Sequence, residues 1–205
     1  MKAQKVLCAA IVIFIFLCVG CSSERRDKSK LLVMRPAKEE PQLYANLGPT
    51  RSVPDGMALD VTDDIILAVP NYIRYDELDS GFLRIRKSGR IDSWFMDLPK
   101  HPATGRVHPT GIAFGPDGNL YAADNQYYAD GNHKSRLLRI NVDNGIPTDC
   151  DVVVEGFNCA RAVRWKGSNC YVADSYWDLP EEGDQSAVFR FGLKEMRRGK
   201  IMVRP

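Results

Sequence analysis

One phrase is written three times along this chain of 205 residues, at a nearly constant spacing. Its copies are PDGMALDVTDDIILAVPN, PTGIAFGPDGNLYAADN and ARAVRWKGSNCYVADS, at 54–71, 109–125 and 160–175. A shorter echo follows each copy, centred on Leu83, Leu138 and Phe189. These residues lie 138 − 83 = 55 and 189 − 138 = 51 positions apart, so a unit of about 50 residues repeats. A period of this length with strand-like content is typical of the blades of a β-propeller.

Each unit divides into four short strands separated by turn signals. First strands are expected at 57–59, 111–114 and 162–165, and second strands at 65–69, 120–123 and 170–173. Third strands are expected at 82–86, 137–141 and 188–191, and fourth strands at 91–96 and 152–156, with 200–203 beginning the last. We therefore predict an all-β chain, a β-propeller of four-stranded antiparallel blades. Residues 49–205 would form this partial propeller, with blades at about 54–100, 108–157 and 160–205.

The loops after the second strands are long, polar and aromatic, at 71–81, 125–135 and 175–186. Because neighbouring strands of a meander run in opposite directions, these loops share one face with the residues that precede each first strand. The opposite face receives only tight turns such as GPDG. The sequence therefore predicts that ligands bind on the long-loop face, at the mouth of the central channel.

The first twenty residues are predicted to be a signal peptide and not part of the fold. Lys2 and Lys5 precede an apolar run at 6–20 that is too short to span a bilayer. The run ends in CVGC, which resembles a bacterial lipobox, where cleavage leaves Cys21 to carry a lipid. A plain secretory signal or a short membrane anchor is the alternative, and either also exports the protein. The expected location is the bacterial cell envelope, with the chain anchored to the membrane and facing the periplasm or the exterior.

Residues 21–48 are polar and charged, so they predict a tether between the membrane and the propeller. Removal of the signal peptide leaves 28 − 2 = 26 basic residues against 26 acidic ones. A neutral chain lacks the basic field that nucleic acid requires, so no nucleic-acid partner is expected. Besides Cys21, the exported chain keeps Cys150, Cys159 and Cys170. Cys150 and Cys159 flank a predicted strand and could pair, although nothing in their spacing requires it.

The repeated phrases resemble those of the senescence-marker-protein/gluconolactonase family, which includes regucalcin-like and luciferin-regenerating-enzyme-like proteins. The most specific stretch is PTGIAFGPDGNLYAAD, although NHL-type propellers contain similar sequence motifs. The resemblance covers 54–205 and implies a six-bladed propeller that hydrolyses a lactone or related ester. It also implies a divalent cation, often Ca²⁺, held on the channel axis by Glu, Asn and Asp side chains. Three units make half of such a ring, so we expect the chain to be the N-terminal part of a longer protein.

One position, just before or at the start of each first strand, differs among the three copies: Asp55, Thr110 and Arg161. Asp55 matches the Asp-Gly phrase that carries a metal ligand in the family, although it could instead cap its own turn. Thr110 stands where the family often has Asn and could face a ligand. Arg161 cannot coordinate a cation; if it points at the axis it favours an anionic ligand, and otherwise it pairs with a loop carboxylate.

The other candidate site residues lie in or beside the long loops. His133 and His108 are candidate general bases, with a solvated loop histidine as the alternative for His133. Further candidates for contact with a ligand are Asn125, Tyr127, Tyr128 and Trp177. The aromatic rings would stack on a sugar ring, or would pack loop against loop. Asp124 and Asp174 recur at the same place in the repeat, so we predict that they bind backbone amides and are not catalytic.

Two functions from different classes follow. The first is a membrane-anchored lipoprotein that hydrolyses a small-molecule substrate, such as a lactone or a sugar derivative, with a divalent cation on the channel axis. The second is a non-catalytic, NHL-like propeller that binds a ligand or a protein at the cell envelope. The sequence holds no GxSxG, HExxH or P-loop motif, so nucleophilic serine, zinc-protease and phosphate-loop chemistry have no support.

Overall fold

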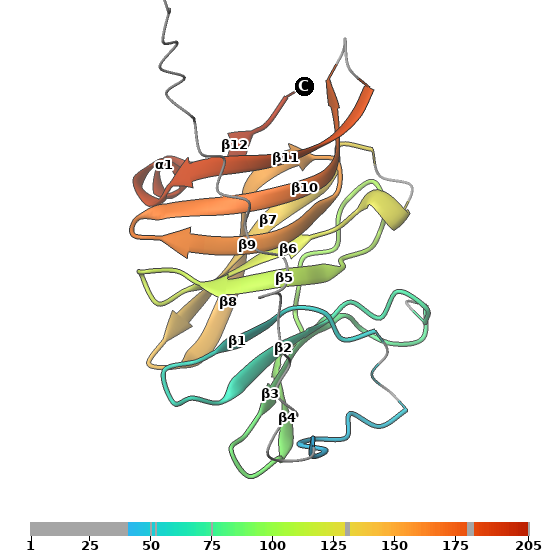
Figure 1. Ribbon diagram of the computed structural model, residues 1–205, viewed down its shortest axis with the longest axis vertical. Helices are drawn as coiled ribbons and strands as arrows, with labels where there is room; N and C mark the ends of the chain where they lie inside the picture. Colours follow the sequence, from blue (N-terminus) through green and yellow to red (C-terminus); the bar gives the residue numbers. More distant parts are fainter. Residues whose placement is uncertain are drawn as a thin grey trace, which may run out of the picture. The chain divides into compact units, whose positions relative to one another are not determined.

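Three antiparallel sheets follow one another along the computed structural model (Figure 1). The first contains β1 (Met57–Leu59), β2 (Ile65–Val69), β3 (Gly81–Ile85) and β4 (Ile91–Phe95). The second contains β5 (Pro109–Phe114), β6 (Leu120–Asp124), β7 (Ser135–Asp143) and β8 (Ile146–Phe157). The third contains β9 (Ala160–Lys166), β10 (Asn169–Leu179) and β11 (Gly183–Gly192). In each sheet every strand pairs with the next one along the chain, so the predicted all-β architecture of antiparallel propeller blades is confirmed.

The structure describes residues 41–49, 51, 53–74, 76–129, 132–179 and 183–204. The predicted signal peptide, the lipid-bearing Cys21 and most of the predicted tether lie outside these residues. Within them, no helix is long and apolar enough to cross a membrane. Cys150, Cys159 and Cys170 are free thiols, so the disulfide that Cys150 and Cys159 could form is not present.

The last strand differs from the prediction. We expected 200–203 to begin the fourth strand of the third blade, but β12 (Ile201–Met202) pairs in parallel with β8 of the second blade. Helix α1 (Leu193–Arg198) separates it from β11 and buries Met196 in the core shared by these two blades. The backbone N–H of Val203 also donates to the carbonyl of Glu155 at 2.8 Å. After α1 buries Met196 between the two blades, the chain therefore returns to the second blade.

Two of the three apolar clusters lie between successive blades, and the third lies on the outward side of the first blade. Strand β6 is buried along its whole length because it has a blade on each side. Leu120 and Ala122 face the core shared with the first blade, whereas Tyr121 and Ala123 face the core shared with the third. Strand β9 has a neighbouring blade on one side in the described part of the chain, and its burial accordingly varies from residue to residue.

Glycines in the innermost strands and just before them let the blades approach closely. A Cβ atom on Gly56 would lie 2.3 Å from the carbonyl oxygen of Thr110, and one on Gly111 would lie 2.2 Å from that of Arg161. The backbone N–H of Gly56 uses this proximity to donate to Thr110 at 3.1 Å. The small residues of the repeated phrase are therefore required by contact between neighbouring blades.

The outward side of the first blade is covered by residues that precede it. Ala45 and Leu47 pack against a buried cluster formed by Leu67, Val69, Leu83 and Ile85. The hydroxyl of Tyr44 donates to the carbonyl of Arg86 at 3.1 Å. The end of the segment predicted as a polar tether is thus apolar enough to cover a blade face.

The aspartates that end the YAAD and YVAD phrases bind backbone amides, as predicted. Asp124 is fully buried and accepts hydrogen bonds from the N–H of His108 and the side chain of Gln126, both at 2.7 Å. Its other oxygen pairs with Arg136 at 2.6 Å. Asp174 accepts from the N–H groups of Asn158, Cys159 and Tyr176 at 2.7, 2.8 and 3.1 Å. Both carboxylates therefore hold the chain where it passes from one blade to the next.

Replacing Asp124 with alanine should lower the free energy of unfolding by about 3–5 kcal/mol, because it leaves the buried Arg136 guanidinium without its counter-charge. The measurement is urea unfolding of the chain followed by circular dichroism. Asp63→Asn is the matched control, since Asp63 pairs with Lys87 at the surface and asparagine tolerates its positive φ of 60°. A loss in Asp124→Ala no larger than that in Asp63→Asn would show that the buried pair does not stabilise the fold.

Candidate functional site

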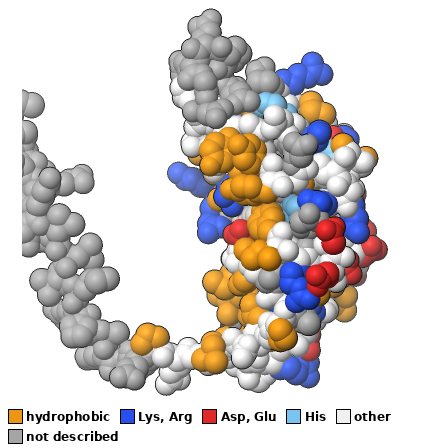
Figure 2. Space-filling model, turned by 90° about the vertical axis from the view of Figure 1, so that its right-hand side faces the viewer, with side chains coloured by type: hydrophobic (Ala, Val, Ile, Leu, Met, Phe, Trp, Pro, Cys, Tyr) orange, Lys and Arg blue, Asp and Glu red, His pale blue; other side chains and the backbone are white. Residues whose placement is uncertain are grey.

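The long loops and the residues that precede the first strands share one face, which we call the loop face. The residues just before β1 lie beside the end of β2, since the N–H of Asp55 donates to the carbonyl of Ala68 at 3.0 Å. Pro109 at the start of β5 lies opposite Asp124 at the end of β6. Figure 2 looks toward this side and shows hydrophobic side chains gathered in a band, with basic and acidic groups beside them. The predicted position of the long loop is therefore observed in the first two blades. In the third blade the loop expected at 175–186 is largely strand, since β10 continues to Leu179 and β11 begins at Gly183.

Four tyrosines from the three blades form a continuous series of ring contacts on the loop face, which we call the tyrosine row. They are Tyr72 of the first blade, Tyr127 and Tyr128 in the 3₁₀ turn η2 (Tyr127–Ala129), and Tyr176 on β10. The ring centroids of Tyr72 and Tyr128 are 5.9 Å apart, those of Tyr127 and Tyr128 5.4 Å, and those of Tyr127 and Tyr176 4.8 Å. Tyr128 and Tyr176 are exposed, whereas burial raises the pKa of Tyr72 well above its usual range. The row thus has an accessible surface on a buried base.

Arg161 lies on the tyrosine row. Its Nη2 donates to the hydroxyl of Tyr128 at 3.0 Å, and its guanidinium carbon is 5.5 Å from the centre of that ring. This is the geometry of a cation–π contact. No ion pair joins Arg161 to a carboxylate among the residues that the structure describes, so the expected pairing with a loop carboxylate is not found there. A half-buried cation is therefore fixed in place by a neutral partner.

Asp55, the predicted metal ligand, is exposed at the start of the first blade, where its backbone N–H donates to Ala68 at 3.0 Å. Partial burial raises the pKa of its carboxyl group, and the charge of Arg161 acts in the opposite direction. Ca²⁺ takes about six to eight oxygen ligands. Within the described residues no three His, Cys, Asp or Glu side chains gather into a metal-binding group. One carboxylate in the field of a guanidinium does not fit a cation site, so no chemical step is assigned to a metal.

Thr110 and Asn125, both predicted to face a ligand, are fully buried and bonded within the fold. The hydroxyl of Thr110 lies within hydrogen-bonding distance of the carbonyl of Ala123, at 3.2 Å, and of two carbonyls at the start of β9. The side-chain amide of Asn125 donates to the sulfur of Cys159 at 3.4 Å, and its oxygen accepts from the N–H of Tyr127 at 3.0 Å. Both residues link the second blade to the third, and Asn125 also bonds the backbone of Tyr127 in the tyrosine row.

His108 is buried at one end of the tyrosine row. Its ring centroid lies 4.8 Å from that of Tyr72, and its Nδ1 is 3.2 Å from the carbonyl oxygen of Asn125. Burial is the main cause that lowers the pKa of this imidazole. The side chain therefore favours the neutral form and packs beneath the row.

His133 and Trp177 contact each other at the edge of the loop face. Their ring centroids are 5.5 Å apart with the rings nearly perpendicular, and Trp177 also packs on Phe189 at 4.8 Å. Only 5% of Trp177 is exposed, so this β10 side chain is used in packing against β11 and the loop of His133. The backbone of His133 has a positive φ of 52°, and its N–H donates to the side chain of Asn158 at 3.3 Å.

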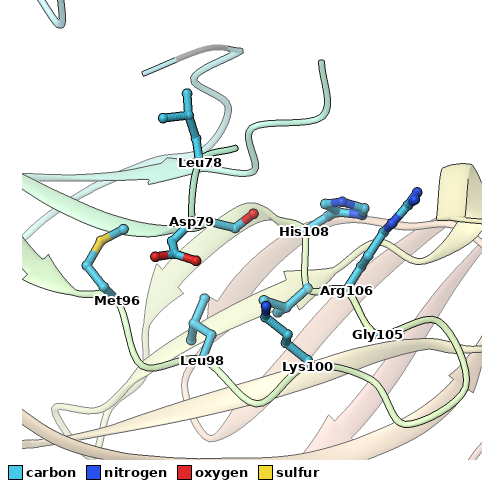
Figure 3. A pocket seen from close by; sticks show the side chains of 10 residues that line it. Leu78, Asp79, Met96, Leu98, Lys100, Gly105, Arg106 and His108 are labelled. Atoms are coloured by element: carbon cyan, nitrogen blue, oxygen red, sulfur yellow. The ribbon is translucent and has the colours of Figure 1, made fainter. Parts of the chain in front are cut away.

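A small pocket of about 50 Å³ opens beside His108 (Figure 3). Its ionisable side chains come from three segments: Asp79 before β3, Lys100 after β4, and Arg106 and His108 before β5. This volume holds a few water molecules and is too small for a sugar ring.

The sequence had not singled out Tyr72, Asp79 or Lys100. One sequence signal could have identified Tyr72 as a site residue: it follows the second strand of the first blade, as Tyr127 follows that of the second blade.

No family model matches the chain, and no curated protein matches it. Solved structures that resemble it include a "putative gluconolactonase", with 17% sequence identity and a TM-score of 0.47, which covers 71% of this chain and 50% of that one. Another is the PQQ-bound aldose sugar dehydrogenase from Streptomyces coelicolor, with 15% identity and a TM-score of 0.46, which covers 69% of this chain and 43% of that one. This chain therefore spans half or less of the length of each. A gluconolactonase is among these similar proteins, as the sequence resemblance implies, and the likeness concerns the fold alone.

Acid should destabilise the fold partly through His108. Because its pKa is lower in the folded chain than the value of about 6.5 in the unfolded one, the unfolded chain binds more protons just below that pH. The free energy of unfolding should therefore fall as the pH is lowered from about 6.5 to 5. The slope should be smaller in His108→Gln, as measured by urea unfolding at a series of pH values.

His101 provides the matched comparison, since burial and the charge of Arg136 also lower its pKa. The double variant with glutamine at both positions should show a smaller slope than either single variant. If His108→Gln keeps the full slope of the unchanged protein, the imidazole of His108 does not contribute to acid sensitivity.

Proposed function

We propose that the loop face binds a small sugar-derived molecule, with the tyrosine row as its stacking surface and Arg161 as a fixed hydrogen-bond donor. The observation that carries this proposal is the continuous contact of four tyrosine rings from three blades, with a guanidinium placed on one of them. Tyrosine offers an apolar ring face and a polar hydroxyl group, which suits a ligand with apolar C–H faces and many hydroxyl groups.

The row is suited to binding because it is accessible at one side and supported at the other. Tyr128 is 54% exposed and Tyr176 37% exposed, so each offers ring surface to a ligand. Beneath them, Asn125 and His108 are buried and bonded to the backbone. Rings that are held in place before a ligand arrives lose little conformational freedom on binding.

Arg161 adds selectivity for an acceptor or an acidic group. Its guanidinium donates to one tyrosine hydroxyl and pairs with no carboxylate among the described residues, so some of its five N–H donors are available to a ligand. A carboxylate on the ligand would accept from it in the charge-assisted geometry that arginine favours. The proposed ligand is therefore a polyhydroxylated molecule whose affinity rises when it carries an acidic group.

Titration with glucose and gluconate, followed by isothermal calorimetry, tests this function. Both should bind, and Tyr127→Ala should weaken both by about tenfold because it interrupts the row. Arg161→Gln should weaken gluconate by about tenfold and glucose by less. Tyr44→Ala and Arg190→Gln are the matched controls, since both residues are exposed and lie outside the row. Equal affinities in Tyr127→Ala and Tyr44→Ala would contradict the proposal.

A second candidate function is hydrolysis of a lactone or related ester, and Asp55 is the observation that favours it. A carboxyl group whose pKa is raised by burial can exchange a proton nearer neutral pH than a solvated one. Gluconolactone turnover that is lost in Asp55→Asn, and that depends on added Ca²⁺, would support this function and the predicted divalent cation. Binding without turnover under both conditions would leave the binding function alone.

We further propose that Cys21 carries a lipid and holds the chain at the bacterial cell envelope, an inference that rests on the CVGC sequence at the end of the apolar run. Labelled palmitate should be incorporated during bacterial expression, and Cys21→Ser should abolish the label. Cys18→Ser is the matched control, since Cys18 would be removed with the signal peptide and the label should persist. A label that survives in Cys21→Ser would refute lipid attachment at this cysteine.

A further inference from the structure

The third blade lacks a strand that the other two blades have. Strand β3 lies between β2 and β4, and β7 lies between β6 and β8, whereas β11 pairs with β10 alone (Figure 1). Strand β12, which follows β11 in the chain, pairs with β8 instead. Among the residues that the structure describes, the outer edge of β11 therefore has no strand beside it. The backbone groups along this edge are a template for a further strand.

Strand β11 has few of the features that protect an exposed sheet edge. Protected edges are usually short or bulged, or they carry proline or lysine. Strand β11 contains neither residue, and its register with β10 is regular from Ala187 to Gly192. This regular stretch carries one charged side chain, that of Arg190. The edge is therefore open to pairing with another strand.

Val188 is a second sign that this part of the blade is an interface. It occupies the place in β11 that Phe82 occupies in β3 and Leu137 in β7, since each is paired with an alanine of the second strand. Phe82 and Leu137 are fully buried, whereas Val188 is 69% exposed. The same apolar position is thus covered in two blades and uncovered in the described part of the third.

We infer that β11 pairs antiparallel with β11 of a second copy of this chain, across a two-fold axis beside Val188. Such an axis maps each face of the sheet onto the same face of the partner. The rings of Phe189 and Phe191, which pack against the core, therefore stay on the core side of the joined sheet. An unrelated strand would have to match this alternation of faces, whereas a second copy matches it by symmetry.

The register centred on Val188 suits the exposed face of the strand. It places Val188 opposite its own copy, so that two exposed apolar side chains cover each other. It also places Arg190 opposite Ser186, so that like charges do not face each other. An axis at Phe189 would set Arg190 against Val188, and an axis at Ala187 would set Val188 against Ser186. This inference does not depend on the proposed sugar-binding function of the loop face.

Sedimentation velocity of the full chain over a range of concentrations tests the association. The unchanged protein should form a dimer, and Val188→Lys should weaken it about tenfold, because two positive charges then face each other in place of two apolar side chains. Val188→Glu should have the same effect for the same reason. An equimolar mixture of the two variants should form dimers again, which a loss of folding in either variant would not allow.

Ile146→Lys is the matched control, since Ile146 is 65% exposed and lies outside β11. It should leave the dimer unchanged. Because every variant keeps the same N-terminal residues, a difference between Val188→Lys and Ile146→Lys reports on β11 and not on association through the predicted signal peptide.

Amide hydrogen exchange distinguishes pairing at this edge from contact through another surface. In residues 187–191, the N–H groups that point away from β10 should exchange at least about tenfold more slowly in the unchanged protein than in Val188→Lys. A chain that stays monomeric at every concentration, a mixture that forms no dimer, or equal exchange of these N–H groups in the two proteins would overturn the inference.

Discussion

The buried carboxylate of Asp124 connects more parts of this fold than any other side chain described above. It binds the backbone just before β5, the side chain of Gln126 in the long loop, and Arg136 at the start of β7. Arg136 in turn donates to the carbonyl of Pro99, in the segment that leaves the first blade. Because desolvation offsets much of the attraction within a buried ion pair, its main contribution is to fix which segments meet.

The third blade shows which part of this arrangement belongs to the repeat. Asp174 also anchors the chain between blades, but it does so with three backbone N–H groups and without an arginine in the place of Arg136. Asp124 and Asp174 occupy equivalent places in the repeat and both anchor the chain between blades. The aspartate that is repeated in the phrase therefore has a structural role in joining one blade to the next. Arg161, by contrast, occupies a position at which the three copies differ, where the other two have Asp55 and Thr110.

The strands could be predicted from the sequence because their signals are local. Turn residues and short apolar runs gave 57–59 and 65–69, which are the bounds of β1 and β2. The partner of β12 could not be predicted, because it depends on where α1 buries Met196. Thr110 and Trp177 were predicted to face a ligand, but the structure buries both. The sequence could not show this, because a polar or aromatic residue near a loop can point either outward or into the fold. Tyr72 was missed for the opposite reason, because only the three-dimensional fold brings its ring to Tyr128.

The network that joins the blades also sets the geometry of the tyrosine row. Gln126 is held through its side chain by Asp124 and through its backbone N–H by Ser135 at 2.9 Å. The next residue, Tyr127, donates its own N–H to Asn125. The backbone that presents Tyr127 is therefore bonded at consecutive positions before any ligand arrives. A surface built from three blades can keep ring–ring distances of 4.8–5.9 Å only if the blades do not move relative to one another. The geometry of the loop face therefore depends on the same buried carboxylate as the fold.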